Sequence, residues 1–120
     1  MAPSEIAVAF LQLAAAGRVD EAWQHVGPGF RHHNPYFAGD GASLKRAMAE
    51  ASAAEPNKAL EVQHVVAEGA LVAVHSRLVR VEGPVIGVVH LLRFEGGLIA
   101  ELWDVGQVIP ADSPNQHGAF

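Results

Sequence analysis

The first third of the chain carries apolar residues at helical spacing. Ile6, Phe10 and Leu13 fall on one face of a helix. Gly17 is suited to end this helix, because glycine readily adopts the left-handed conformation of a C-terminal cap. Two further helices are predicted over residues 20–26 and 42–54. Gly27-Pro28-Gly29 is expected to end the first of them, and Pro56 to stop the second.

The second half of the chain switches to segments rich in valine, leucine and isoleucine. Short glycine-containing connections separate these segments, and this pattern is typical of hairpins. The predicted strands cover residues 59–67, 70–81, 85–94 and 98–108, and residues 30–34 are expected to be a short strand or an extended loop. Helices followed by an antiparallel meander predict an α+β domain, with the helices on one face of a curved sheet.

Both faces of the predicted strands are apolar. In the segment 85–94, Val88 and Leu92 share one face, while Val89 and Leu91 occupy the other. One face can pack against the helices, and a second copy of the chain is the simplest cover for the other. We therefore expect a homodimer formed through the outer sheet face.

Composition narrows the class of protein. The chain has 120 residues, half of them hydrophobic, which predicts one domain spanning 1–120. Its net charge of −5 and eight scattered basic residues argue against nucleic-acid binding. The apolar stretch Ile6–Ala16 is too short to cross a membrane and lacks the basic start of a secretory signal. The absence of cysteine excludes disulfides and thiolate chemistry and fits a reducing cytoplasm.

An aspartate interrupts the apolar face of the last predicted strand. Asp104 shares strand parity with Leu98, Ala100 and Leu102. A carboxylate among apolar neighbours has its charged form disfavoured, so its pKa is expected to rise toward the range useful for acid/base catalysis.

The chain is also rich in histidine, with seven in total. His90 lies on the apolar face of the preceding strand, and a meander would bring it opposite Asp104. A single such histidine is ordinarily a core residue satisfied by backbone or water, but two facing polar groups suggest a site. Of the adjacent His32 and His33, only one can face inward from an extended segment, and we expect it to be His33.

Two more histidines lie on the predicted strands. His64 shares parity with Leu60 and Val62, whereas the direction of His75 is ambiguous because Arg77 lies on the same face. Two histidines and one carboxylate suit Fe(II), Zn²⁺ or similar ions with open positions. An alternative hypothesis is therefore a metal site built from His33, His75, His90 and Asp104.

Several segments carry a resemblance to a known family. They are His33-Asn34-Pro35 with Gly41, Val74-His75-Ser76-Arg77, Glu101-Leu102-Trp103-Asp104-Val105 with Gln107 and Pro110, and Asn115 with Gly118 and Phe120. With them the chain resembles the SnoaL-like branch of the nuclear transport factor 2-like superfamily, whose members include predicted aldol-condensation catalysts. The resemblance covers nearly the whole chain and keeps the order of the motifs.

The resemblance implies a cone-shaped barrel, in which a strongly bent antiparallel sheet wraps around N-terminal helices and an internal pocket, usually in a homodimer. Relatives include polyketide cyclases and ketosteroid isomerase, which move protons next to a carbonyl without a cofactor. It implies Asp104 as the acid/base residue and His33 beside it. The expected ligand contacts are Asn34, Phe37, His64 and His75.

Two positions depart from the family pattern. His90 stands where relatives commonly have an aspartate, and Leu102 stands where they have a histidine. The pocket has thus exchanged an acid for a base on one strand.

The leading functional hypothesis is a cofactor-independent enzyme acting on a small apolar carbonyl compound. Asp104 would remove a proton next to the carbonyl, while His33 or His90 donates to the developing enolate oxygen. Aldol-type cyclisation, isomerisation and dehydration all fit this chemistry. The alternatives are the metal site described above and a module that binds a small apolar ligand without catalysis.

Overall fold

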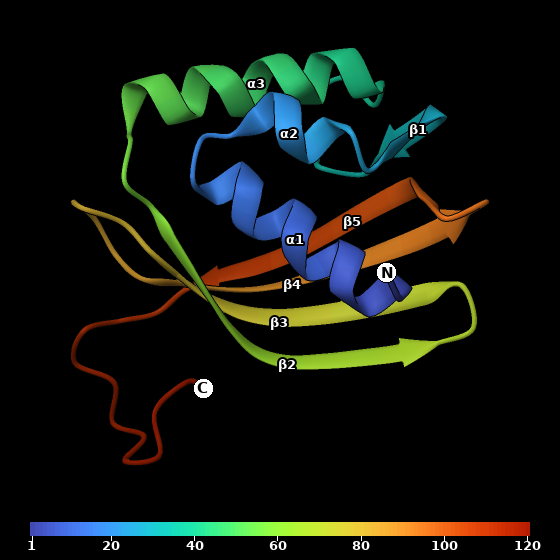
Figure 1. Cartoon of the computed structure of the whole chain (residues 1–120). Helices are drawn as coiled ribbons and strands as arrows, with labels where there is room; N and C mark the ends of the chain where they lie inside the picture. The colour runs from blue at the N-terminus through green and yellow to red at the C-terminus, as the bar shows by residue number, and fades with distance from the viewer.

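The computed structural model describes all 120 residues, which form three helices and five strands. The helices are α1 (Pro3–Ala15), α2 (Val19–Trp23) and α3 (Gly41–Ala54); the strands are β1 (Val26–His32), β2 (Ala59–Glu68), β3 (Leu71–Val79), β4 (Ile86–Glu95) and β5 (Leu98–Val108). All three helices lie on one side of the sheet, and the C-terminal tail lies on the other (Figure 1). None of the helices combines the length and the apolar character needed to span a membrane.

The helix ends follow local chemistry. Gly17, just beyond α1, has a φ of +80°, as predicted for a glycine cap. Asp40 caps α3, because its side chain accepts hydrogen bonds from the Ser43 backbone N–H (2.9 Å) and hydroxyl (2.7 Å). These local signals place α1 and α3 where the sequence predicts them, whereas the predicted helix over residues 20–26 ends at Trp23 and Val26 already belongs to β1.

The sheet has the strand order β1-β5-β4-β3-β2. Strands β2 to β5 form the predicted antiparallel meander, but β1 pairs with β5 in parallel, so the sheet is mixed rather than wholly antiparallel and is not closed. The segment Gly27-Pro28-Gly29, expected to end a helix, instead lies inside β1. Proline is tolerated there because β1 is an edge strand and the pairing is irregular between Val26 and Arg31.

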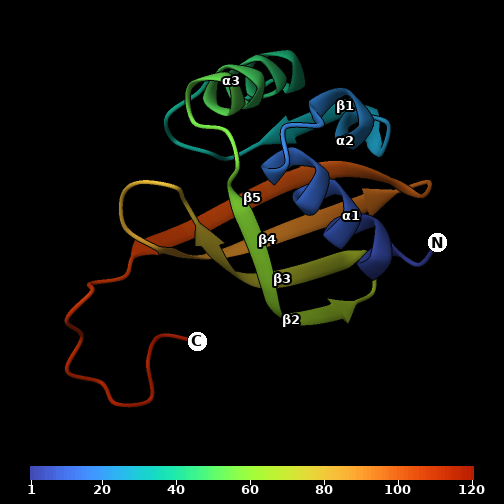
Figure 2. The ribbon, with the colours of Figure 1, turned by 60° about the vertical axis from the view of Figure 1, so that its left-hand side comes forward.

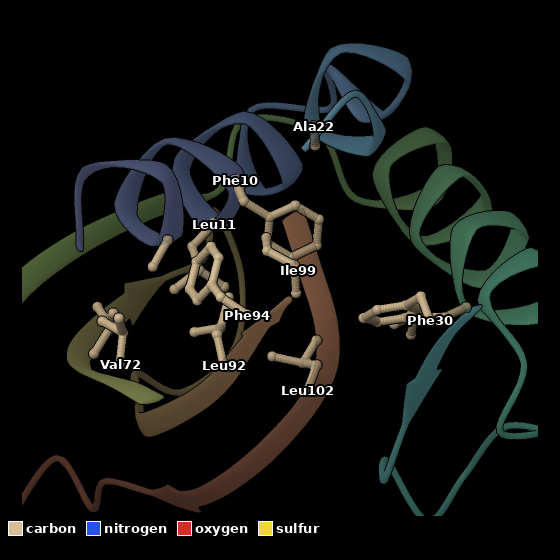
Figure 3. Packing of buried hydrophobic residues seen from close by; sticks show 12 residues of the cluster. Phe10, Leu11, Ala22, Phe30, Val72, Leu92, Phe94, Ile99 and Leu102 are labelled. Atoms are coloured by element: carbon tan, nitrogen blue, oxygen red, sulfur yellow. The ribbon is translucent and has the colours of Figure 1, made fainter. Parts of the chain in front are cut away.

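The core fills the space between α1 and the inner face of the sheet, which is the face toward the helices (Figure 3). Phe10 is fully buried and contacts the ring of Trp23, which in turn packs edge-on against Phe30. The buried cluster comprises Ala7, Phe10, Leu11, Ala22, Phe30, Leu44, Val72, Val74, Leu92, Phe94, Ile99 and Leu102. Figure 2 shows α1 lying across the strands and the C-terminal tail extending away from them.

Two bulges bend the strands and change which face their side chains occupy. The register shifts in β2 at Gln63, between Val62 and His64, and in β5 at Ala100, which lies opposite the step from Arg93 to Phe94. The shift in β5 places Ile99 rather than Leu98 in the core with Leu102, so the predicted shared face of Asp104 with Leu98 and Ala100 is wrong. The first shift places His64 opposite His75, on the outer face, so the predicted shared face of His64 and Val62 is wrong. A bulge adds one residue to one strand and thereby inverts the alternation beyond it.

We expect Leu92→Ala to lower the free energy of unfolding by about 3 kcal/mol, because it removes a fully buried side chain from a packed core. Urea denaturation followed by circular dichroism measures this change. Val81→Ala is the matched control, since Val81 is 68% exposed and its truncation should change stability by less than about 0.5 kcal/mol. Equal effects of the two substitutions would contradict the assignment of this core.

Candidate functional site

A cavity of about 180 Å³ lies between α1, α3 and the inner sheet face. Most of its lining is apolar, and the two polar side chains are His90 and Lys58. The apolar lining consists of Leu11, Ala14, Ala15, Met48, Ala51, Leu60 and Leu78. A larger hollow of about 620 Å³ lies outside, between α1 and the free edge of β2, and touches none of the candidate residues. The smaller cavity is therefore the candidate site.

His90 is the imidazole at this cavity. It pairs with Asp104 in the β4–β5 register, so the predicted approach of the two residues across the sheet is confirmed. Burial lowers the pKa of His90 to about 4, against a smaller opposing effect of the Asp104 charge. The ring is therefore neutral at pH 7. Its Nδ1 is buried and has no hydrogen-bond partner within the chain.

A second buried polar atom without a partner lies on the neighbouring strand. Ser76 is fully buried, and its Oγ makes no hydrogen bond. Ser76 pairs with Val88, two residues before His90, so Ser76 and His90 are diagonal neighbours on the inner face. Ser76 was not predicted to be an inward polar residue, although it alternates with the apolar Val72 and Val74, and this alternation is the signal of such a residue. Native proteins leave few such groups unsatisfied, and their grouping marks a polar spot.

Asp104 continues this polar row on β5. Its Oδ2 accepts a hydrogen bond from Asn34 Nδ2 at 3.0 Å, while Asn34 Oδ1 accepts from the Tyr36 backbone N–H at 3.0 Å. Asp104 is only partly buried, so the expected carboxylate enclosed by apolar side chains is wrong in this respect. A polar amide holds the carboxylate in place beside His90. Asp104 lies next to the cavity and is not part of its wall.

The predicted inward direction of His33 is wrong. Its Nε2 lies 2.6 Å from Glu101 Oε2, and its ring stacks on Trp103 with centroids 4.8 Å apart, on the outer face. His32 is the buried one: its Nε2–H donates to the Ala38 carbonyl, and its Nδ1 accepts the Asn34 backbone N–H. Alternation along β1 allows one inward histidine, as expected. That histidine is His32, because its ring makes hydrogen bonds to the backbone of the following turn.

Glu101 is the centre of a charged cluster that sequence reasoning missed. Its side chain is 6% exposed and accepts hydrogen bonds from Arg31 Nε (2.9 Å), His33 Nε2 (2.6 Å) and Arg93 Nε (3.0 Å). The hydrogen bond from Arg31, followed by that from His33, lowers the Glu101 pKa to about 2. The cluster joins β1 and β4 to β5.

The other predicted contacts lie away from the cavity. His64 Nδ1 and His75 Nδ1 are 3.1 Å apart on the outer face, and Phe120 of the tail stacks on His75. Phe37 is 47% exposed in the loop between β1 and α3. The alternative metal set is thus divided, with His33 and His75 on the outer face and His90 and Asp104 on the inner one. No three histidine, aspartate or glutamate side chains converge as a metal site.

The fold and this cavity define a class of protein: a small α+β domain whose bent sheet and helices enclose a pocket. Residues 7–102 match the family model of the SnoaL-like domain. The chain therefore belongs to the SnoaL-like family, within the nuclear transport factor 2-like superfamily.

Solved structures share this fold. A cystatin-fold protein from Novosphingobium aromaticivorans is similar with a TM-score of 0.78 and 18% identity, covering 88% of this chain and 98% of its own. IdmH from Streptomyces antibioticus, a proposed polyketide cyclase, has a TM-score of 0.71 and 22% identity, covering 89% and 93%. An NTF2-like protein from Cytophaga hutchinsonii has a TM-score of 0.70 and 16% identity, covering 89% and 91%. A search of curated proteins found no match.

We expect Glu101→Gln to destabilise the fold at pH 7 and to remove an acid-sensitive step. The folded-state pKa of about 2 lies below the ordinary value of 4.5, so the carboxylate stabilises the protein above pH 4.5. That contribution is lost as the pH falls from 4.5 toward 2. Urea denaturation between pH 7 and pH 2.5 measures it in both proteins. An unchanged pH dependence in the variant would contradict the role of Glu101.

Proposed function

We propose that the protein catalyses proton transfer next to the carbonyl of a small molecule, without a cofactor. The Asp104 carboxylate removes the α-proton, and the neutral His90 imidazole donates a hydrogen bond to the developing enolate oxygen. Because the pKa of His90 is about 4, the ring remains neutral throughout the physiological range. A neutral imidazole serves as an electrophile in other isomerases.

The observation that carries this proposal is the buried His90 nitrogen without a partner. His90 lines a cavity that is apolar apart from His90 and Lys58, and it lies directly across from Asp104. Directly opposed residues on antiparallel strands have Cβ atoms about 5 Å apart. A carbonyl compound held beside His90 would therefore also be within reach of the Asp104 carboxylate. An apolar cavity with a few polar groups is the usual form of a small-molecule site.

Asn34 supports the base in this scheme. Its Nδ2 binds Oδ2 of Asp104, which restrains the carboxylate and leaves Oδ1 available to a substrate. Ser76 Oγ, one strand beyond His90, is a second buried polar atom without a hydrogen-bond partner, although Ser76 is not part of the cavity wall. The side chains of Asn34, Asp104, His90 and Ser76 thus form a row across four neighbouring strands or their connecting turns.

The family gives the reaction class some support. The chain carries a SnoaL-like domain, and IdmH, which shares its fold, is a proposed polyketide cyclase. Aldol-type cyclisation, isomerisation and dehydration by a lyase route all begin with the proton transfer proposed here. The lack of cysteine is consistent with work in a reducing cytoplasm.

Exchange of α-protons for deuterium tests the proposal without knowledge of the substrate. We expect the protein to accelerate exchange into phenylacetone or acetylacetone in deuterium oxide, followed by proton NMR. Asp104→Asn should slow this exchange about 100-fold or more, because it removes the base. His90→Phe should slow it to a similar degree, because it removes the donor to the oxyanion.

His75→Gln is the control, since His75 lies on the outer face and should leave the rate unchanged. Full exchange activity in Asp104→Asn would contradict the assignment of the base. Absence of exchange in the wild-type protein with every ketone would contradict catalysis. If those ketones still bound in calorimetry, the cavity would belong to a binding module instead.

We also propose that the outer sheet face pairs two copies of the chain. Val89 and Val105 are paired neighbours on this face and are 40% and 73% exposed, and Val66 is 65% exposed. An exposed apolar pair on a sheet face is a candidate site of association, and a two-fold dimer is the commonest arrangement.

Val89→Glu combined with Val105→Glu should convert this dimer to a monomer, because it buries four like charges at a two-fold interface. Light scattering coupled to size-exclusion chromatography measures the mass. Circular dichroism confirms that the fold is retained. A monomeric wild-type protein would contradict the proposal.

A further inference from the structure

One charged side chain of the cavity has no part in the proposed proton transfer. Lys58 lies immediately before β2, is partly buried and lines the cavity. It forms no salt bridge, whereas Glu55, three residues earlier, accepts from Arg80 with both carboxylate oxygens (2.7 and 2.9 Å). The charge of Lys58 acts on the Glu55 carboxylate, but Arg80 occupies both oxygens of that carboxylate. The Lys58 ammonium therefore has no direct ion pair within the chain and is free to bind a ligand anion.

Lys58 and His90 lie toward opposite ends of the cavity. His90 pairs with Val74 of β3, while Leu60, two residues after Lys58, pairs with Leu78. Val74 and Leu78 are separated by roughly 13 Å along the strand. The distance between the Lys58 and His90 side chains is shorter than this, because both side chains line the cavity that lies between these positions.

The volume of the cavity limits the ligand. At about 180 Å³ it is slightly larger than the cavity of about 150 Å³ that holds benzene in an engineered protein. It is smaller than the range of about 300–1,000 Å³ typical of pockets for drug-sized ligands. One ring or a short branched chain fills this volume, and a second fused ring would extend out of the open side of the cavity.

The charges at the two ends also orient the ligand. Asp104 stands beside His90, so a ligand carboxylate is repelled from that end and attracted toward Lys58. The uncharged carbonyl end of the same molecule is then left at His90. The polarity of the cavity therefore matches a molecule with an anion at one end and a carbonyl at the other.

We infer that the substrate is a small carbonyl acid, a single-ring or short-chain compound whose carboxylate binds Lys58 and whose carbonyl lies at His90. This inference rests on the proposed function for the role of the carbonyl. The size and the charge of the ligand follow from the cavity itself.

Isothermal titration calorimetry with matched probes tests the charge. Para-acetylbenzoate and para-acetylbenzamide have the same shape and differ in charge, and we expect the acid to bind about tenfold more tightly. Lys58→Met keeps the unbranched stem and should bring the two affinities together. Lys45→Met is the control, because Lys45 pairs with Asp20 away from the cavity and should leave the preference intact.

The naphthalene analogue of para-acetylbenzoate tests the size, and we expect it to bind about tenfold more weakly because the cavity lacks room for a second ring. Equal binding of acid and amide, or a preference that persists in Lys58→Met, would overturn the inference of an anionic substrate. Equal binding of the naphthalene analogue would overturn the size limit.

These binding results are independent of turnover. A Lys58-dependent preference for the acid without deuterium exchange would leave the anion site standing and remove the proposed catalysis. Exchange of neutral ketones with no preference for the acid would remove the anion site alone.

Discussion

The hydrogen-bonded register between β4 and β5 controls both faces of the sheet. On the inner face it pairs His90 with Asp104 at the cavity, and on the outer face it pairs Arg93 with Glu101. A shift of one residue would move every side chain of a strand to the opposite face. The buried pair Leu92 and Leu102 opposes such a shift, because the shift would move apolar side chains out of the core.

The titratable side chains on the two faces of the sheet are in opposite environments. Glu101 is surrounded by cations, and its pKa falls to about 2, so it remains charged and holds strands together. His90 is desolvated, so it remains neutral, and its buried Nδ1 has no hydrogen-bond partner within the chain. Saturated polar groups stabilise a fold, whereas unsatisfied ones at a cavity are candidates for binding and catalysis.

The sequence was most informative where the physics is local. Cap residues such as Gly17 and Asp40 act within one turn of a helix, and glycine turns join neighbouring strands, so the helices and the meander could be predicted. The facing of His90 and Asp104 followed as well, because a tight hairpin joins their strands. His64 could not be placed, since one bulge in β2 inverted the alternation on which its prediction depended.

By itself, the sequence determined the α+β class, the order of the elements and the inward pair at β4 and β5. Only the tertiary structure decided that His32 rather than His33 turns inward, that Glu101 accepts from two arginines and a histidine, and that Lys58 reaches the cavity. Each of these depends on groups brought together from distant parts of the chain. Strand parity states which residues share a face, but contacts between elements depend on bulges, edge pairing and helix placement, which no local pattern encodes.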